Sequence, residues 1–347
     1  MRVVILVGVV ALVAGMLLGV STVSGGEAPT PTAMAGRIET VSIVPPSANA
    51  FLAAAIPSPV WTTGPTPTSA PTATPLPATD TPVLASVTPT RAAPTNTGAS
   101  APPQVNAWSV AVIDEESGAL LYSRDPHRRM APASLTKIFT ALVALKHGDL
   151  GQNIKVQFDQ AELVDSTLMG IKPGDTYTLE DLLYGLMLPS GNDSALAIAN
   201  VIGGSESHFA VMMNSQAADL GLTDSHFVNP HGLDSPTHYS SAFDLAMAAR
   251  YGMTHYEEFR SLAKARTWEV HGTNDYWLFN LNRFLRSYNG SDGVKIGYTD
   301  NAGRAIVASA TRNGHRVYVA LLHCGDIVSD SVPLFNWVFA NYTWPTT

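Results

Sequence analysis

The chain has almost no cysteine and no run of basic residues. Cys324 is the only cysteine among 347 residues, so an internal disulfide and cysteine-rich zinc or iron–sulfur sites are excluded. The formal net charge is −8, and residues 104–347 carry all of it, because three Arg balance two Glu and one Asp in residues 1–103. Without a basic cluster, no nucleic-acid partner is expected.

The N-terminus contains the one long apolar segment of the chain. Val3–Val20 has no polar side chain and follows Arg2. Its 18 residues exceed the apolar core of an ordinary signal peptide and just reach membrane-spanning length. Residues 1–26 are therefore expected to form a membrane anchor or a signal segment. Because the early positive charge precedes this segment, the rest of the chain is expected outside the cytoplasm, tethered to the membrane or secreted to the cell wall.

Proline, threonine, serine and alanine dominate the next part of the chain. Residues 27–103 hold 16 of the 24 prolines. Proline removes backbone donors and breaks helices, and this segment offers little apolar surface for a core. A disordered or polyproline-like stalk is therefore expected over residues 27–103.

Residues 104–347 have the patterning of one folded domain. Strand-like segments occur near both ends, and apolar residues recur at helical spacing between them. This order predicts an α+β fold in which both ends of the domain build one antiparallel sheet, flanked by helices and interrupted by a helical insertion. The expected elements are a hairpin turning at Ser117-Gly118, helices near 132–147, 178–188, 192–204, 205–221 and 240–252, a strand near 293–299, a hairpin turning at Asn313-Gly314, and a last helix near 328–342.

A lysine stands inside an otherwise apolar helical segment, APASLTKIFTALVAL. The apolar residues cover more than one face, so the helix is expected to be buried and Lys137 with it. A buried lysine is costly unless it is paired or used. Ser134 lies three residues earlier on the same face, where its hydroxyl can meet the amine.

Short motifs occur elsewhere in the chain, and only their flanking residues indicate which copies belong to a site. Ser261 and Lys264 repeat the S-x-x-K spacing, but in a charged segment that is expected to be a solvated helix. Ser190 and Asn192 lie in LPSGND, a tight loop between two predicted helices. Lys295 begins a K-x-G triplet in the strand that precedes the last hairpin.

Taken together, these segments resemble the low-molecular-mass penicillin-binding D-alanyl-D-alanine carboxypeptidases. The resemblance covers nearly all of 104–347 and includes APASLTK, KPGDTYTLEDLLYGLMLPSGNDSA, FVNPHGLDSPTHYSSAFDLA and GVKIGYTDNAGRAIVASAT. It implies a β-lactamase/D,D-peptidase-like fold and a serine peptidase that removes the terminal D-Ala from peptidoglycan stem peptides. It further implies β-lactam antibiotics as covalent inhibitors, and no metal or organic cofactor.

The resemblance also implies roles for individual residues. Ser134 would be the nucleophile and a neutral Lys137 its base, since a serine hydroxyl is a poor nucleophile alone. Burial and the nearby charge of Lys295 would favour that neutral amine. Ser190 would relay a proton to the leaving group, and Asn192 would hold the substrate amide and the lysine.

The K-x-G strand would supply the remaining substrate contacts. The N–H of Ser134 and the N–H of Tyr298, next to Gly297, would bind the developing oxyanion. Ile296 departs from the family, which has Thr or Ser there to bind the terminal carboxylate of the substrate. Thr299 and Arg304 are possible substitutes for that hydroxyl. Because isoleucine cannot donate a hydrogen bond, a D,D-endopeptidase and a wall-binding pseudoenzyme stay open as alternatives.

Two further alternatives depend on other residues. The segment HFVNPHGLDSPTHYS supplies His226, His231, Asp234 and His238, although their spacing matches no standard helical metal pair. A β-lactamase on the same fold would turn over penicillin quickly, but the loop here is S-G-N rather than the S-D-N of class A enzymes.

Overall fold

The computed structural model describes residues 91–158, 163 and 166–345. The predicted anchor at residues 1–26 and most of the predicted stalk lie outside these residues. Within the described part of the chain, no helix is both long and apolar enough to cross a membrane.

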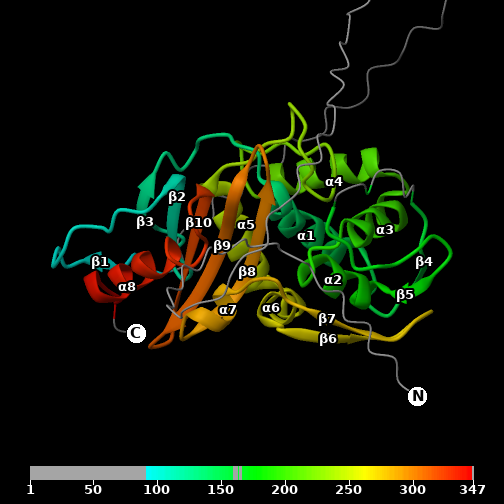
Figure 1. Cartoon of the computed structure of the whole chain (residues 1–347). Helices are drawn as coiled ribbons and strands as arrows, with labels where there is room; N and C mark the ends of the chain where they lie inside the picture. The colour runs from blue at the N-terminus through cyan, green and yellow to red at the C-terminus, as the bar shows by residue number, and fades with distance from the viewer. Residues whose placement is uncertain (1–90, 159–162, 164–165, 346–347) are drawn as a thin grey trace, which may run out of the picture. The chain divides into compact units, whose positions relative to one another are not determined.

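An antiparallel five-stranded sheet forms the centre of the domain, in the order β3-β2-β10-β9-β8 (Figure 1). Its strands are β2 (Ala107–Asp114), β3 (Leu120–Arg124), β8 (Ser291–Thr299), β9 (Gly303–Arg312) and β10 (His315–Cys324). The first two strands come from the start of the domain and the other three from its end. The predicted α+β fold, with one sheet built from both ends and helices inserted between them, is therefore confirmed.

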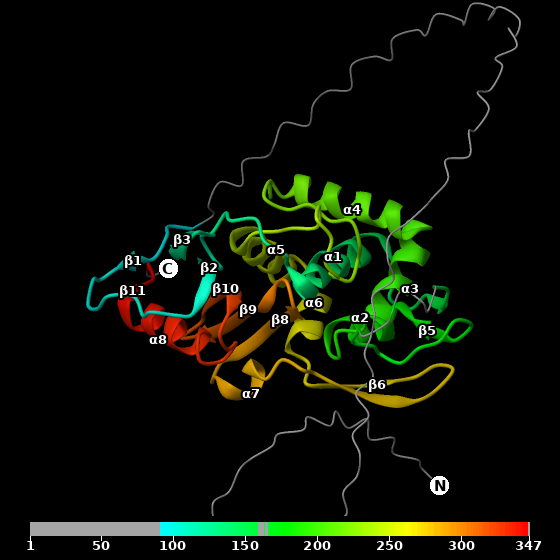
Figure 2. The same ribbon diagram turned by 45° about the horizontal axis from the view of Figure 1, so that its top comes forward.

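Helices cover both faces of this sheet (Figures 1 and 2). Helices α5 and α6, with α1 beyond them, pack over one face, and α7 and α8 pack over the other. The helices are η1 (Ala133–Thr136, a 3-10 turn), α1 (Lys137–His147), α2 (Leu179–Met187), α3 (Asn192–Gly203), α4 (Glu206–Asp219), α5 (Ala242–His255), α6 (Glu257–Lys264), α7 (Phe284–Ser287) and α8 (Ser331–Asn341).

Several element ends follow directly from local chemistry. Thr178 caps α2, because its side chain accepts the N–H of Asp181. Gly204 ends α3 at φ 70°, a left-handed conformation that glycine adopts without strain. Asn313 and Gly314 turn the β9–β10 hairpin with φ 51° and 84°, as the Asn-Gly pair predicts.

The fold begins earlier than the predicted boundary at residue 104. Strand β1 (Thr95–Asn96) pairs with β11 (Tyr342–Thr343) at the far end of the chain. The Asn341 side chain accepts the N–H of Ser100 at 2.6 Å, and the Trp337 indole donates to the Ser100 carbonyl at 3.0 Å. Residues 95–103 therefore pack on the folded domain, which composition did not reveal because their partners lie more than 230 residues away.

Two small hairpins lie outside the main sheet and were not predicted. Strands β4 (Asn153–Lys155) and β5 (Thr176–Thr178) form one, and β6 (Thr267–Val270) and β7 (Tyr276–Phe279) form the other. Their strands have only three or four residues, which is too short for periodicity to separate strand from loop.

Candidate active site

The amine of Lys137 lies at the centre of the site. Its side chain is completely buried in the first turn of α1, and its Nζ lies 3.0 Å from Ser134 Oγ. Nζ also lies 2.6 Å from Asn192 Oδ1 and 2.7 Å from the carbonyl oxygen of His231. The structure thus brings the serine and lysine of one segment together with the asparagine of another, as expected from the sequence.

These three contacts determine what a neutral amine does at this position. An uncharged amine has two hydrogens and one lone pair. Asn192 Oδ1 and the His231 carbonyl accept hydrogen bonds, so they take both hydrogens. The lone pair is then left facing the hydroxyl of Ser134, which is the arrangement that a general base requires.

The surroundings favour that neutral amine. Burial first, and then the positive charge of Lys295, lower the pKa of Lys137 well below its ordinary value, while the carboxylate of Asp193 raises it. Burial also lowers the pKa of Lys295, to about 7. Lys295 is 2% exposed, and its Nζ donates to the carbonyl oxygen of Ile296 at 3.1 Å.

Asp193 is a buried carboxylate that sequence reasoning did not single out. It accepts hydrogen bonds from the N–H groups of Met169, Gly170, Ile171 and Ser194, at 2.7–3.1 Å. These bonds hold the 167–171 segment against the start of α3. They fix the loop that carries Ser190 and Asn192, and the aspartate directly after the S-G-N pattern was the available sequence clue.

Ser190 occupies a strained backbone position with a free hydroxyl. Its φ is 64°, which is uncommon for a residue other than glycine. Its carbonyl oxygen accepts a hydrogen bond from Thr167 Oγ1 at 2.7 Å. Its own hydroxyl is buried and has no hydrogen-bond partner in the described residues, so it is available to a bound substrate.

Strand β8 lies directly against the serine turn. A Cβ added at Gly297 would lie 3.0 Å from the backbone nitrogen of Ser134, so a larger residue would push the strand and the serine turn apart by a few tenths of an ångström. Thr299 Oγ1 donates to Asp234 Oδ1 at 3.0 Å. Tyr298 is 60% exposed, and its hydroxyl donates to Asp300, so its side chain contributes nothing to the buried site.

The loop 229–234 contacts both Lys137 and the end of β8. Besides the His231 carbonyl, it brings Gly232 so near η1 that an added Cβ would lie 1.9 Å from the Ala133 oxygen. Asn229 holds the loop closed, since its Oδ1 accepts the N–H of Gly232 at 2.7 Å and its Nδ2 donates to the Leu233 carbonyl at 2.9 Å. In the sequence, this segment stands out only for its histidines and Asp234, as an alternative metal site.

The histidines of the alternative metal site are engaged in hydrogen bonds. Val228 N–H donates to Nδ1 of His238, whose Nε2–H donates to Thr136 Oγ1 at 2.8 Å. Burial lowers the pKa of His238 to about 3, so its ring is neutral at physiological pH. His231 Nδ1 accepts the N–H of Leu233. Both rings therefore support the backbone of the site.

Neither Ile296 nor Arg304 reaches the site. Ile296 pairs with Ile306 and packs in the apolar cluster on the α8 face of the sheet, opposite to Lys295 and Gly297. The guanidinium of Arg304 lies 3.5 Å from the carbonyl oxygen of Gly325. Thr299 is thus the proposed substitute that stays close to the site.

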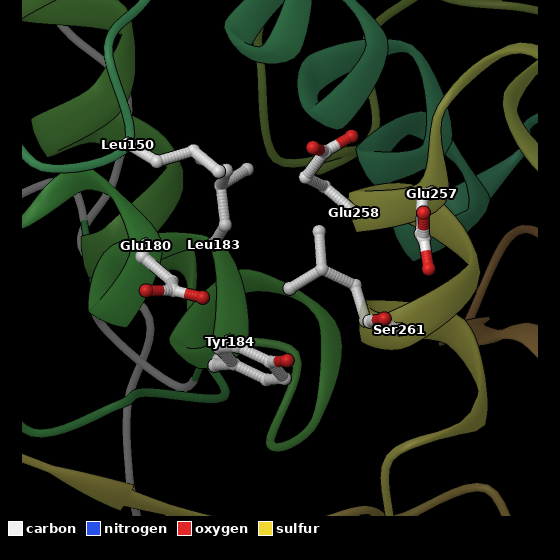
Figure 3. A pocket seen from close by; sticks show the side chains of 8 residues that line it. Leu150, Glu180, Leu183, Tyr184, Glu257, Glu258 and Ser261 are labelled. Atoms are coloured by element: carbon white, nitrogen blue, oxygen red, sulfur yellow. The ribbon is translucent and has the colours of Figure 1, made fainter.

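The second S-x-x-K pattern lines a separate pocket. Ser261 borders a cavity of about 180 Å³ between α2 and α6, together with Glu180, Glu257 and Glu258 (Figure 3). Lys264 is exposed at the end of α6. No residue of the Ser134 site lines this cavity.

Comparison with known proteins places the chain in a family. The family model described as D-alanyl-D-alanine carboxypeptidase, peptidase family S11, matches residues 95–324. The chain belongs to this family. The match begins at the residue where β1 begins, and it covers every residue of the site described above.

Curated members of the family are similar at about one third identity. The D-alanyl-D-alanine carboxypeptidase DacF of Bacillus subtilis is 37% identical over 216 residues, which are 60% of this chain and 55% of the relative. DacB2 of Mycobacterium tuberculosis is 34% identical over 243 residues, which are 67% of this chain and 81% of the relative. The chain thus spans little more than half the length of the Bacillus protein.

Solved structures agree with this assignment. The Streptomyces K15 DD-transpeptidase is 30% identical with a TM-score of 0.65, and the alignment covers 70% of this chain and all of the transpeptidase. A D-alanyl-D-alanine carboxypeptidase from Mycobacterium tuberculosis is 32% identical with a TM-score of 0.66, over 71% of this chain and 95% of that structure.

Substituting Gly232 tests whether the loop 229–234 positions the nucleophile. Gly232→Ala is expected to slow acylation of Ser134 by penicillin by about 100-fold, because the new Cβ displaces the Ala133–Ser134 turn. Gly314→Ala is the matched control, since Gly314 also has positive φ, at 84°, but has no neighbouring atom within 4 Å. Equal rates for the two variants in a stopped-flow acylation assay would show that the close approach is not needed.

The two lysines predict a bell-shaped pH dependence of kcat/KM. We expect activity to rise with pH through the lowered pKa of Lys137, because a base at this position acts in its neutral form. We expect activity to fall as pH rises through about 7, because Lys295 then loses the charge with which it would bind a carboxylate. Lys295→Arg should move the alkaline limb to higher pH, because guanidinium stays charged. The control Lys264→Arg should leave the profile unchanged, and an unmoved alkaline limb in Lys295→Arg would contradict the assignment.

Proposed function

We propose that this protein is a serine D,D-carboxypeptidase that removes the terminal D-Ala from peptidoglycan stem peptides and is acylated by β-lactams. The observation that carries the proposal is the buried Lys137 amine, 3.0 Å from Ser134 Oγ with both of its hydrogens assigned to other acceptors. Membership of the D-alanyl-D-alanine carboxypeptidase family supports the substrate class.

Acylation uses Lys137 as the base and Ser134 as the nucleophile. Lys137 takes the hydroxyl proton while Ser134 Oγ forms a bond to the carbonyl carbon of the penultimate D-Ala. The oxyanion is bound by the N–H groups of Ser134 and Tyr298. The proton then passes through the free hydroxyl of Ser190 to the nitrogen of the terminal D-Ala, the C–N bond breaks, and an ester on Ser134 remains.

Hydrolysis of the ester follows the same route with water as the nucleophile. Lys137 is neutral again after it has given up the proton, so it can take a proton from the attacking water. Lys137 returns this proton to Ser134 Oγ, which leaves as the alcohol, and the shortened peptide leaves as a carboxylic acid that loses its proton to the solvent. No step requires a metal or an organic cofactor.

Substrate binding is assigned to groups around this chemistry. Asn192 holds the substrate amide as well as Lys137, and Lys295 and Thr299 face the terminal carboxylate. Gly297 keeps β8 close enough to Ser134 for a peptide to lie between the strand and the Ser190 loop.

The domain would act outside the cytoplasm, held at the membrane by residues 1–26 and the stalk.

The two S-x-x-K serines give a direct test of the nucleophile. Ser134→Ala is expected to abolish covalent labelling by a fluorescent penicillin, because Ser134 Oγ is the one hydroxyl that bonds to the buried amine within the described part of the chain. Ser261→Ala, the matched control, should label like the unsubstituted protein. Mass spectrometry of the labelled peptide checks both results, and the reverse pattern would place the active site at the α2–α6 pocket.

A second candidate function is a D,D-endopeptidase that cleaves internal cross-links. It rests on the small number of side chains at the site that could bind the terminal carboxylate of a substrate. Ile296 offers no donor and faces the α8 side of the sheet, and Arg304 contacts Gly325 instead. Products from purified pentapeptide and from cross-linked dimer separate the two functions. Release of D-Ala from the pentapeptide supports the carboxypeptidase, whereas cleavage of the dimer alone supports the endopeptidase.

Thr299→Val tests which group binds the carboxylate. The loss of a hydrogen bond to a charged group costs about 1.5–3 kcal/mol, so kcat/KM for a peptide ending in D-Ala-D-Ala should fall by roughly 10- to 100-fold. The same peptide ending in a carboxamide should be cleaved at an unchanged rate. Equal losses on both substrates would mean that Thr299 supports the fold through Asp234 and Ala302 and does not bind the carboxylate.

A further inference from the structure

A row of large apolar side chains is exposed along β7. Trp277, Phe279 and Leu281 are 54%, 60% and 52% exposed. Side chains two residues apart in a strand lie on the same face, so Trp277 and Phe279 point outward together, and Leu281 follows directly after the strand. They account for three of the nine large hydrophobic side chains that are exposed in the described residues. We call these three residues the β7 row.

The other face of the β6–β7 hairpin is firmly attached to the domain. Trp268 stacks on Tyr184 with ring centroids 3.6 Å apart, and its indole donates to Asp181 Oδ1 at 2.8 Å. The N–H of Leu281 donates to the carbonyl oxygen of Leu188 at 3.1 Å. The β7 row is therefore held in place on the outer edge of the domain, where both views show the hairpin beside α2 and α6 (Figures 1 and 2).

The segment that contains the β7 row is basic in an otherwise acidic domain, although the exposed Glu269 lies directly opposite Trp277 in the hairpin. Residues 264–286 contain four basic and two acidic residues, a net charge of +2, whereas the rest of residues 104–347 carries −10. All four basic residues are exposed: Lys264, Arg266, Arg283 and Arg286. Arg283 also contacts Asp326.

We propose that the β7 row and its basic surroundings dock on the surface of an anionic lipid bilayer. Exposed aromatic and aliphatic side chains flanked by Lys and Arg suit a bilayer interface, because the rings enter the headgroup region while the cations meet lipid phosphates. Apolar patches of this kind are rare on soluble monomers unless they have a partner. The predicted apolar segment Val3–Val20 would hold the domain within reach of such a surface.

Docking would also orient the active site relative to the bilayer. Leu281 is bonded to Leu188, two residues before Ser190. The hairpin is therefore attached directly to the segment that leads into the Ser190 loop, and a bilayer contact would set the direction in which the site faces. This contact is separate from the N-terminal segment, which would tether the domain without orienting it.

A fluorophore on the row tests the proposal in the full chain. Leu281→Cys carries an environment-sensitive label, and Val211→Cys on α4, where Val211 is 62% exposed, is the matched control. Cys324 is buried and its thiol pKa is raised to about 12, so it stays unlabelled. With phosphatidylglycerol–phosphatidylcholine vesicles, the emission of the label at 281 should shift to the blue and the label at 211 should not. Trp277→Ser with Phe279→Ser should remove the shift.

Penicillin labelling of Ser134 shows that each variant is folded and distinguishes failure of this proposal from failure of the proposed function. An absent shift at 281, or equal shifts at 281 and 211, would overturn the docking. The same shift with pure phosphatidylcholine vesicles would overturn the role of the basic residues. A shift without vesicles that grows with protein concentration would assign the β7 row to contact with a second copy of the chain.

Discussion

The site depends on one buried amine that contacts no carboxylate among the residues that the structure describes. Lys137 is fully buried, and its three hydrogen-bond partners are a hydroxyl, an amide oxygen and a backbone carbonyl. A charge at such a place is costly, and Lys295 nearby adds repulsion. The same features that destabilise a charged lysine produce the base that the chemistry needs.

The surrounding elements converge on this amine from four parts of the chain. The start of α1 supplies Lys137, the start of α3 supplies Asn192, the loop 229–234 supplies the His231 carbonyl, and β8 supplies Lys295. Buried polar groups need partners, and the backbone that carries Asn192 and His231 is itself held by further hydrogen bonds. Asp193 fixes the start of α3, and Asn229 closes the loop. The site is therefore as rigid as the helices and strands that carry it.

Much of the fold was predictable because its elements have strong local patterns. The buried helix around Lys137, the cap at Thr178 and the Asn313-Gly314 turn each follow from residue type and spacing. Strand β1 was missed because its partner, β11, lies at the other end of the chain. The β6–β7 hairpin was missed because its strands are only four residues long.

The site was predictable only in its residue types. The S-x-x-K, S-G-N and K-x-G patterns, read with their flanks, identified the family, which the comparison confirms. Spacing along the chain contains no information on which carbonyl meets Lys137 or on which face of β8 a side chain lies. The His231 carbonyl, the Asp193 bonds and the far-face packing of Ile296 therefore emerged only from the three-dimensional arrangement.

The most direct test of this account is the protonation state of Lys137 in the folded protein. Nitrogen-15 NMR with labelled lysine, assigned by comparison with Lys137→Arg, follows the Nζ resonance of Lys137 through a pH titration. We expect a neutral amine at pH values where an exposed lysine such as Lys264 is still fully protonated. An ammonium at Lys137 that persists up to the ordinary lysine pKa would contradict its role as the base.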